Sequence, residues 1–313
     1  MRRRPLGKTG MQVTELGLGT WGLCGDGYGP VREADQDRVI ERALALGIDL
    51  FETAASYAHG AMERRLGRLL PRQGVHVVTK LGTDRAASPP RKRFDPEYLR
   101  RTFEQSRERL ARDVIDVVLL HGPSIQAIER GGALDVMREL RERGHVRAWG
   151  VAAGSAETGR SAILNGAEVV SLPYNAFHSS DLRSLGAVIE ERQVGVLVHS
   201  VLCYGLLCGH WSAQRQFVEG DHRSERWTPD ELRQRVRQLD ALRPVVRGDV
   251  TSIRAGALRF VLESRFVHGA LLGPRTPVQL DQLVRDAGKG PPYLERDQLT
   301  ALEARLREVG VDA

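Results

Sequence analysis

Short apolar segments rich in Val, Ile and Leu alternate along the chain with segments whose apolar residues recur every three or four positions. The apolar runs have the length of buried strands, and the periodic segments have the length of helices. Strands are predicted at 15–20, 48–51, 75–80, 114–121, 146–152, 169–174, 194–200 and 267–272, and the helices that follow them at 34–46, 61–70, 95–110, 134–143, 155–164, 181–192, 250–263 and 277–287. Eight such units in regular alternation predict an α/β fold, a (β/α)8 TIM barrel.

Three segments outside this alternation complete the predicted architecture. Residues 2–16 read as a short N-terminal hairpin, expected to close the floor of the barrel. The longest insertion, 209–249, follows the seventh strand, carries a helical run at 229–242 and is expected to lie over the mouth. A tail helix is predicted at 296–309. Because the length and a hydrophobic content of 41% suit one barrel, we predict a single domain over 1–313.

Composition bears on the compartment and on metal binding. No window approaches 18 apolar residues, and no apolar signal core follows the Arg-rich start, so a cytoplasmic protein without a membrane span is expected. Cys24, Cys203 and Cys208 are odd in number, and the close pair has no His or Cys partner nearby in the sequence. Reduced thiols are therefore favoured over a disulfide or a zinc site, and no metal site is predicted.

The net charge of +6 raises the question of a nucleic-acid partner. Basic and acidic residues are interspersed along helical faces such as 96–113, a pattern typical of a solvated surface, so nucleic-acid binding is not favoured. The connection 82–94 is also basic. We interpret it as a mobile solvated loop in preference to a basic lid for an acidic substrate. The sequence says nothing about the oligomeric state.

Lysine is rare in this chain. Of 46 basic residues only four are lysines, so 46 − 4 leaves 42 arginines. A Lys at the end of an apolar strand, as at Lys80, therefore indicates a need for a compact ammonium whose proton responds to its surroundings. Other strand ends carry Glu52, Tyr57, His121 and His199. Such side chains are individually more often structural or solvated, but strand ends of a parallel barrel meet at one face, so together they favour a catalytic site.

Seven stretches in one consistent order make the chain resemble the aldo-keto reductase family over nearly its whole length. They are RRPLGKTGMQVTELGLGTWG, DLFETAASYAHGAMERRLG, VVTK, VVLLH, SLPYN, HSVLCYGLL and GPRTPVQL. The resemblance implies a barrel that holds NADPH in extended form and reduces aldehydes or ketones, with a small-molecule carbonyl compound as substrate. It implies catalytic roles for Glu52, Tyr57, Lys80 and His121, and cofactor contacts from Gly19, Thr20, Trp21, Ser200, Leu202, Gly205, Arg275 and Gln279.

The chemistry of the four catalytic positions can be argued separately. A phenol with a pKa near 10 is a poor acid at neutral pH, and a nearby ammonium stabilises the phenolate. Lys80 is therefore expected to lower the pKa of Tyr57. A carboxylate from Glu52 would keep Lys80 charged, and His121 could donate a hydrogen bond to the carbonyl oxygen of the substrate. Hydride would arrive from the nicotinamide as Tyr57 supplies the proton.

Departures from the family pattern concentrate where the nicotinamide is expected. Glu52 stands where the family has Asp and is longer by one C–C bond, about 1.5 Å. Ala152 and Ala153 replace the Ser and Asn that hold the carboxamide, Ser171 replaces a Gln, and His199 replaces a stacking aromatic residue. Each carboxamide hydrogen bond left unmade costs about 1 kcal/mol unless water or another group replaces it.

The diphosphate and adenine end is better preserved, although Val201, Gln282 and Leu283 stand where the family has Pro, Glu and Asn. Two hypotheses therefore stay open. The favoured one is an NADPH-dependent oxidoreductase that reduces an aldehyde or ketone. The other is an aldo-keto-reductase-like scaffold that has lost ordinary hydride transfer and acts as a non-redox enzyme or a cofactor-sensing binding protein. The identity of the substrate cannot be read from the sequence.

Overall fold

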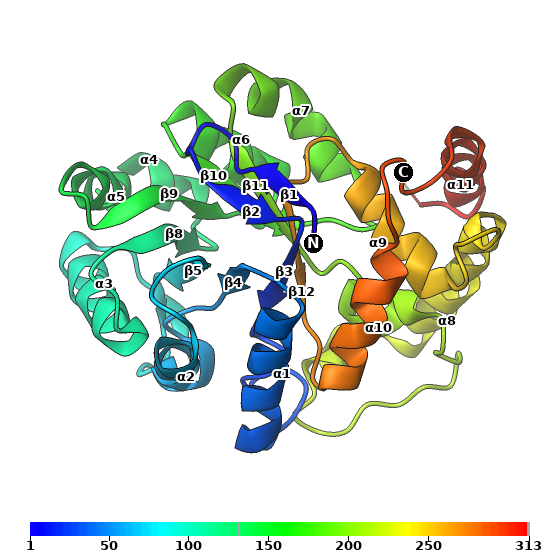
Figure 1. Cartoon of the computed structure of the whole chain (residues 1–313), viewed down its shortest axis with the longest axis horizontal. Helices are drawn as coiled ribbons and strands as arrows, with labels where there is room; N and C mark the ends of the chain where they lie inside the picture. Colours follow the sequence, from blue (N-terminus) through cyan, green and yellow to red (C-terminus); the bar gives the residue numbers. More distant parts are fainter. Residues whose placement is uncertain (131, 312–313) are drawn as a thin grey trace.

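Eight parallel strands close into a barrel in the computed structural model, which describes residues 1–130 and 132–311 (Figure 1). Around the barrel the strands follow chain order, and the last pairs with the first. They are β3 (Leu16–Gly19), β4 (Leu50–Glu52), β5 (His76–Leu81), β8 (Ile115–His121), β9 (Val146–Ala152), β10 (Val169–Pro173), β11 (Gly195–His199) and β12 (Gly269–Leu272). The (β/α)8 prediction is confirmed. The predicted domain also included residues 131, 312 and 313, which lie outside the described residues.

Helices surround the barrel, as the periodicity predicted (Figure 1). Those in the eight repeating units are α1 (Glu33–Ala45), α2 (Ala61–Leu69), α3 (Pro96–Leu110), α5 (Ala133–Glu142), α6 (Ala156–Leu164), α7 (Ser180–Arg192), α9 (Ile253–Glu263) and α10 (Pro277–Ala287). Local capping explains several starts: the Asp95 carboxylate accepts from the Tyr98 N–H and Pro96 occupies the first turn of α3. Among the described residues, no helix is both long and apolar enough to cross a membrane.

Two apolar layers hold the fold together. One lies between the helices and the outer face of the barrel and includes Phe51 and Phe103, both fully buried. The other fills the barrel interior, where Leu50, Val117 and Leu197 pack together. Since parallel strands are covered on both faces, their sequences are continuously apolar rather than alternating, which is why the sequence marks them as runs.

The N-terminal hairpin closes the barrel floor as predicted. It consists of β1 (Arg3–Pro5) and β2 (Gln12–Thr14), and it lies across one end of the barrel (Figure 1). Leu6 and Val13 are fully buried in the same cluster as the inward-facing barrel residues. With this end sealed by side chains, the opposite end, at the carboxyl ends of the strands, is left for chemistry.

Other elements depart from the sequence-based boundaries. The basic connection 82–94 contains a small antiparallel ribbon, β6 (Thr83–Asp84) and β7 (Arg91–Lys92), where a mobile solvated loop was expected. An unpredicted short helix, α4 (Ile125–Arg130), precedes α5. The helical run predicted at 229–242 is α8 (Pro229–Gln238) followed by a 3-10 segment, η4 (Leu239–Val245). Pro244 lies in that segment and, lacking an N–H, cannot extend an α-helix there.

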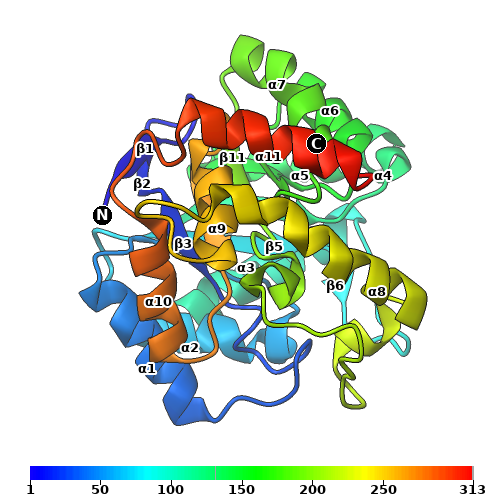
Figure 2. The ribbon, with the colours of Figure 1, turned by 90° about the vertical axis from the view of Figure 1, so that its right-hand side faces the viewer.

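The tail helix α11 (Arg296–Glu308) packs beside η4, close to α8 in the side view (Figure 2). Its attachment is specific: Gln298 Nε2 donates to the Val245 carbonyl at 3.0 Å, and Gln238 Nε2 donates to the Val309 carbonyl at 2.8 Å. The insertion after β11 is therefore anchored at its far end to the C-terminal tail, while its beginning remains at the barrel mouth.

Candidate active site

The four predicted catalytic side chains line one cavity at the carboxyl ends of the strands. Glu52 ends β4, Lys80 lies near the end of β5 and His121 ends β8, while Tyr57 begins the short 3-10 turn η1 (Tyr57–Gly60) that follows β4. The cavity has a volume of about 1040 Å³, at the upper end of the usual range of about 300–1,000 Å³ for small-molecule sites. Strand register alone brings these residues from separate segments to one place.

The ammonium of Lys80 is the centre of this group. It donates to Tyr57 Oη at 3.1 Å and to the Thr53 carbonyl at 3.0 Å, and it forms an ion pair with the Glu52 carboxylate. Lys80 and Glu52 are both buried. An ammonium has three donors, so this one is fully used. Glu52 is longer than the Asp that the family has at this position, and its carboxylate still pairs with the Lys80 ammonium.

His121 faces the phenol across the cavity. The ring of Tyr57 lies edge-on to the His121 ring, with centroids 6.1 Å apart. His121 lines the cavity, and its buried Nδ1 has no hydrogen-bond partner within residues 1–130 and 132–311. The His121 ring and the Tyr57 phenol lie close enough together to contact the carbonyl oxygen of one bound substrate.

Burial sets the direction of the pKa shifts in this site. It raises the pKa of the Tyr57 phenol, and it lowers the pKa of Lys80 well below its usual value. Burial, helped by the positive charge of Lys80, also lowers the pKa of His121. The pKa of Tyr57 is therefore raised rather than lowered, with burial as the main cause, and the expected stabilisation of the phenolate by Lys80 stays a prediction.

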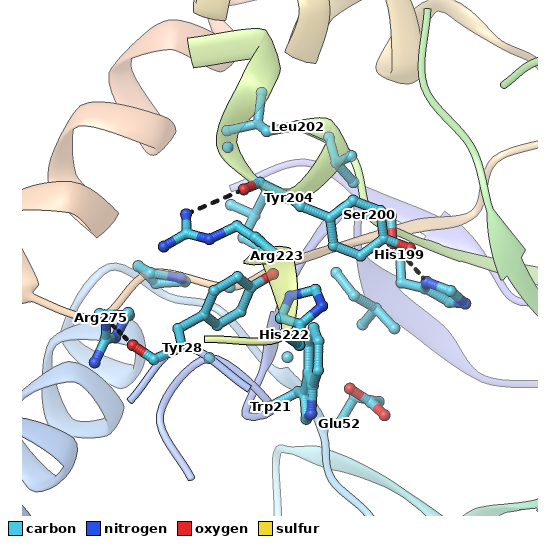
Figure 3. A pocket seen from close by; sticks show the side chains of 18 of the residues that line it. Trp21, Tyr28, Glu52, His199, Ser200, Leu202, Tyr204, His222, Arg223 and Arg275 are labelled. Carbon is cyan, nitrogen blue, oxygen red and sulfur yellow. Dashed lines mark hydrogen bonds between the residues drawn. The ribbon is translucent and has the colours of Figure 1, made fainter. Parts of the chain in front are cut away.

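His199, which ends β11, lies beside Ser200 in the same cavity (Figure 3). Its Nδ1 is 3.1 Å from Ser200 Oγ. Burial lowers the pKa of His199 to about 4, so the ring is neutral at pH 7. A neutral imidazole is flat and polar, so it can present one face and one ring nitrogen to whatever lies against it.

The backbone around the site adopts conformations that are rare elsewhere. In the described part of the chain seven non-glycine residues have positive φ, and five of them follow Tyr57 or His199: Ala58, His59, Ser200, Cys203 and Tyr204. Left-handed backbone at residues with a Cβ is energetically costly, and it concentrates at sites where the chain must turn sharply around a ligand. The two loops are therefore shaped at some cost in stability.

Most of the predicted cofactor-binding residues line the same cavity, namely Gly19, Trp21, Ser200, Leu202, Gly205, Arg275 and Gln279. Thr20 does not. It is fully buried, and its N–H donates to the Glu52 carbonyl at 3.0 Å, so it holds the loop after β3 against β4. Among the departures from the family pattern, Ala152 and Ala153 line the cavity, whereas Ser171 is fully buried outside its lining.

Arg275 makes contacts that the sequence did not indicate. Its guanidinium donates to the carbonyl oxygens of Tyr28 at 3.0 Å, Gly29 at 2.9 Å and Pro30 at 3.0 Å (Figure 3). Its own N–H donates to Gln279 Oε1 at 2.8 Å. The side chain thus ties the loop after β12 to the loop after β3, and its predicted contact with a ribose phosphate stays a prediction.

A cluster of aromatic and basic side chains over the mouth was not identified from the sequence. Trp21, Tyr28 and His222 have ring centroids 4.6–5.0 Å apart, and the Arg223 guanidinium lies 4.8 Å from the Tyr28 ring (Figure 3). The His222 N–H donates to the Gly27 carbonyl at 2.9 Å. The many aromatic residues of the predicted insertion were a sequence signal for this cluster. Tyr28 belongs to a distant segment, and no sequence feature connected it with the insertion.

Comparison with known proteins agrees with the fold. The model of the Aldo/keto reductase family matches residues 15–290. The chain therefore belongs to the aldo-keto reductase family, a family of oxidoreductases that act on carbonyl compounds.

Individual relatives extend this match over almost the whole chain. It is 30% identical over 302 residues to Aldo-keto reductase YhdN of Bacillus subtilis (strain 168), which covers 92% of this chain and 89% of that protein. It is 29% identical over 307 residues to the NADH-specific methylglyoxal reductase of Escherichia coli (strain K12), covering 91% and 93%. The structure is similar to that of the glycerol dehydrogenase AKR11B4 from Gluconobacter oxydans, with a TM-score of 0.84, 25% identity and coverage of 99% and 97%.

Proposed function

We propose that the protein is an NADPH-dependent oxidoreductase that reduces an aldehyde or ketone, with Tyr57 as the proton donor. The observation that carries the proposal is the 3.1 Å contact between the Lys80 ammonium and Tyr57 Oη, in the cavity that Glu52 and His121 also line. Four polar side chains from separate segments meet there, and two of them are buried charges held in an ion pair. Such an arrangement is costly for the fold and is retained where chemistry needs it.

The residues present fit a reduced dinucleotide. The cavity is large enough for an extended ligand, and Arg254 and Arg275 lie on the side that follows β11 and β12. The loop after β3 contributes Gly19 and Trp21, while Thr20 supports it from behind. Guanidinium groups bind phosphates through paired N–H donors, and the loop after the last strand is the common phosphate site of these barrels. Arg275 favours NADPH over NADH only through its sequence position, which matches the ribose-phosphate contact of the family; to bind that phosphate, its guanidinium would exchange its present contacts with backbone carbonyls.

The proposed chemistry assigns one task to each side chain. When bound, the reduced nicotinamide supplies the hydride. His121 Nε2 donates a hydrogen bond to the substrate carbonyl oxygen and fixes its position. As that oxygen becomes an alkoxide, Tyr57 Oη delivers its proton to it, and the Lys80 ammonium stabilises the phenolate left behind. Burial raises the pKa of Tyr57, which keeps the proton on the phenol until the far more basic alkoxide forms.

The alternative, a barrel that has lost hydride transfer, rested on the altered nicotinamide pocket. Of those positions, Glu52 keeps its ion pair with Lys80. Ala152 and Ala153 widen the cavity without blocking it, and His199 offers a polar ring there. The intact group around Lys80 favours the reductase.

The test is carbonyl-dependent oxidation of NADPH and of NADH by the purified protein with a panel of aldehydes. Tyr57→Phe removes the proton donor and should lower kcat by about 100- to 10,000-fold, the usual contribution of a general acid. NADPH binding, followed by nicotinamide fluorescence, should stay at the micromolar level. Tyr98→Phe, in a buried tyrosine of α3, is the matched control and should retain activity. An unchanged rate in Tyr57→Phe would show that another group donates the proton.

A further inference from the structure

Positive charge reaches the barrel mouth from two opposite sides. Arg275 follows β12, and Arg254 begins the helix before it, so both belong to the side proposed for the cofactor phosphates. Lys92 ends the ribbon strand β7 in the connection that follows β5 and reaches the end of β8. In the order of strands around the barrel, β8 stands four strands away from β12, on the far side of the eight-stranded ring. The phosphates of one dinucleotide cannot account for both.

The Lys92 ammonium is held at the reacting end of the cavity. It donates to the His121 carbonyl at 2.6 Å and to Thr83 Oγ1 at 2.9 Å. Both contacts are to neutral acceptors, and they use two of its three donors. The ribbon formed by β6 and β7 brings Thr83 and Lys92 opposite each other, so the backbone itself fixes this position. The remaining donor is available to the cavity, which Lys92 lines.

Of the seven other lysines and arginines that line the cavity, four pair with carboxylates, whereas Arg215, Arg226 and Arg275 have no carboxylate partner among the described residues. Arg85 pairs with Asp26 at 3.0 Å, Arg223 pairs with Asp221, and Arg254 pairs with Asp286. No carboxylate lies within ion-pair distance of Lys92 among residues 1–130 and 132–311. Glu52, the sole acidic residue described in the cavity lining, is engaged by Lys80. Within these described residues, Lys92 is thus a cation without a carboxylate partner beside the proposed catalytic residue His121.

Lys92 is exposed at the rim of the cavity, and two nearby groups respond to its charge. Burial lowers its pKa, and its positive charge contributes to the lowered pKa values of His121 and Lys80. An ammonium near two other cationic or cation-prone groups gains stability when a negative group binds beside it.

We infer that the substrate is a carbonyl compound that carries an anionic group, a carboxylate or a phosphate, which the Lys92 ammonium binds while His121 and Tyr57 hold the carbonyl oxygen. This inference rests on the proposed reductase function and adds the substrate class to it. Lys92 is accordingly a specificity-determining residue. The largely exposed connection 82–94 thereby presents one basic side chain at the rim of the cavity.

Matched pairs of substrates test the inference. The first pair is 4-carboxybenzaldehyde and its neutral methyl ester, and the second is glyceraldehyde 3-phosphate and glyceraldehyde, so that the two pairs separate carboxylate from phosphate. In at least one pair the anion should have the higher kcat/KM, by about five- to tenfold, as for a charged hydrogen bond near solvent. The preference should fall as salt is raised.

Variants assign the preference to one side chain. Lys92→Met should bring the ratio of the two kcat/KM values close to one, whereas Lys92→Arg keeps the charge and should retain most of the ratio. Lys8→Met, in the hairpin at the opposite end of the barrel, is the control and should leave the ratio unchanged. A ratio near one in the unaltered protein, or an equal loss for both members of a pair in Lys92→Met, would overturn the inference.

Binding separates this inference from the proposed function. Trp21 and Trp211 line the cavity, so their fluorescence can report occupancy without turnover. The alcohols 4-(hydroxymethyl)benzoate and methyl 4-(hydroxymethyl)benzoate are suitable probes of the holoenzyme. The acid should bind about five- to tenfold more tightly than the ester, and Lys92→Met should abolish the difference. Charge-selective binding without NADPH oxidation would reject the reductase while keeping the anion site, and equal binding would reject the anion site alone.

Discussion

The Lys80 ammonium lies 3.1 Å from the phenol oxygen of Tyr57 and 4.7 Å from the centre of its ring. Tyr57 is held there from a turn after β4, and Lys80 from the neighbouring strand β5, so the contact depends on strand pairing. The ammonium is saturated by Tyr57, Thr53 and Glu52. The ammonium stabilises a neutral phenol only weakly. It stabilises a phenolate much more strongly, because the phenolate carries the opposite charge.

The ion pair between Glu52 and Lys80 should be needed for both stability and turnover. Glu52→Gln leaves a buried ammonium without its counter-ion, so the free energy of unfolding should fall by about 3–5 kcal/mol. The rate should fall as well. Without the carboxylate, the buried Lys80 loses its proton more readily, and an uncharged amine cannot stabilise the phenolate. Glu52→Asp keeps the charge and should be affected less in both. Urea unfolding and steady-state turnover measure the two effects.

The control for this pair is Glu41→Gln, at an exposed position of α1. It removes the same charge without disturbing a buried pair. If Glu52→Gln unfolded at the same urea concentration as Glu41→Gln, the pair would contribute nothing measurable to the fold.

His199 should make the protein less stable as the pH falls below neutrality. Its pKa is about 4 in the folded protein and about 6.5 in an unfolded chain. Between these values the unfolded chain binds a proton that the folded protein does not. The stability from a neutral His199 is therefore complete above pH 6.5 and is lost as the pH falls towards 4. The loss is at most about 3 kcal/mol.

Urea unfolding at pH 7, 6, 5 and 4 measures this dependence. The titration of carboxylates adds to the loss at the acidic end, so the comparison with a variant isolates the histidine. His199→Gln should lose less stability over the range than the unaltered protein, and the exposed His210→Gln should follow the unaltered protein. Parallel curves for all three would show that His199 is protonated in the folded state as easily as in water.

Glu63 should be a second buried charge on which the fold depends. It is fully buried on α2, pairs with Arg109 of α3 at 2.7 Å and accepts from Thr79 Oγ1 of β5 at 2.6 Å. Glu63→Met leaves Arg109 without a counter-ion, and the free energy of unfolding should fall by about 3–5 kcal/mol. The double variant Glu63→Met with Arg109→Met removes both charges and should recover much of that loss.

A double-mutant cycle by chemical denaturation checks this expectation. Equal stability of the single and the double variant would mean that the cost comes from lost packing rather than from the unpaired guanidinium. Because Thr79 precedes Lys80, the kcat of the double variant also shows whether this network supports the site.

The barrel and its catalytic group could be predicted because their signals are local. Each strand is an apolar run that must be buried on both faces, and each helix repeats its apolar residues with the helical period. The alternation leaves few topologies, and any parallel barrel brings its strand ends to one face. The prediction that Glu52, Tyr57, Lys80 and His121 lie together is therefore confirmed by the structure, where all four line one cavity.

The remaining features depend on contacts between distant segments. Arg275 binds carbonyl oxygens some 245 positions earlier in the chain, and Thr20 turns out to be buried behind the cavity. The pKa of Tyr57 is raised where a lowered value was expected, because the phenol is buried. A local sequence pattern predicts neither how deeply a residue is buried nor which distant group a flexible side chain contacts.

The sequence by itself determined the fold class, the order of the elements and the identity of the groups at the strand ends, since each follows from periodicity and chain order. Tertiary structure alone decided that Lys92 lies beside His121 with no carboxylate partner in the described part of the chain, and that Trp21, Tyr28 and His222 gather over the mouth. A charged side chain on a loop can face solvent or a substrate, depending on how the loop packs against its neighbours. That packing is set by the closed barrel and not by the sequence of the loop alone.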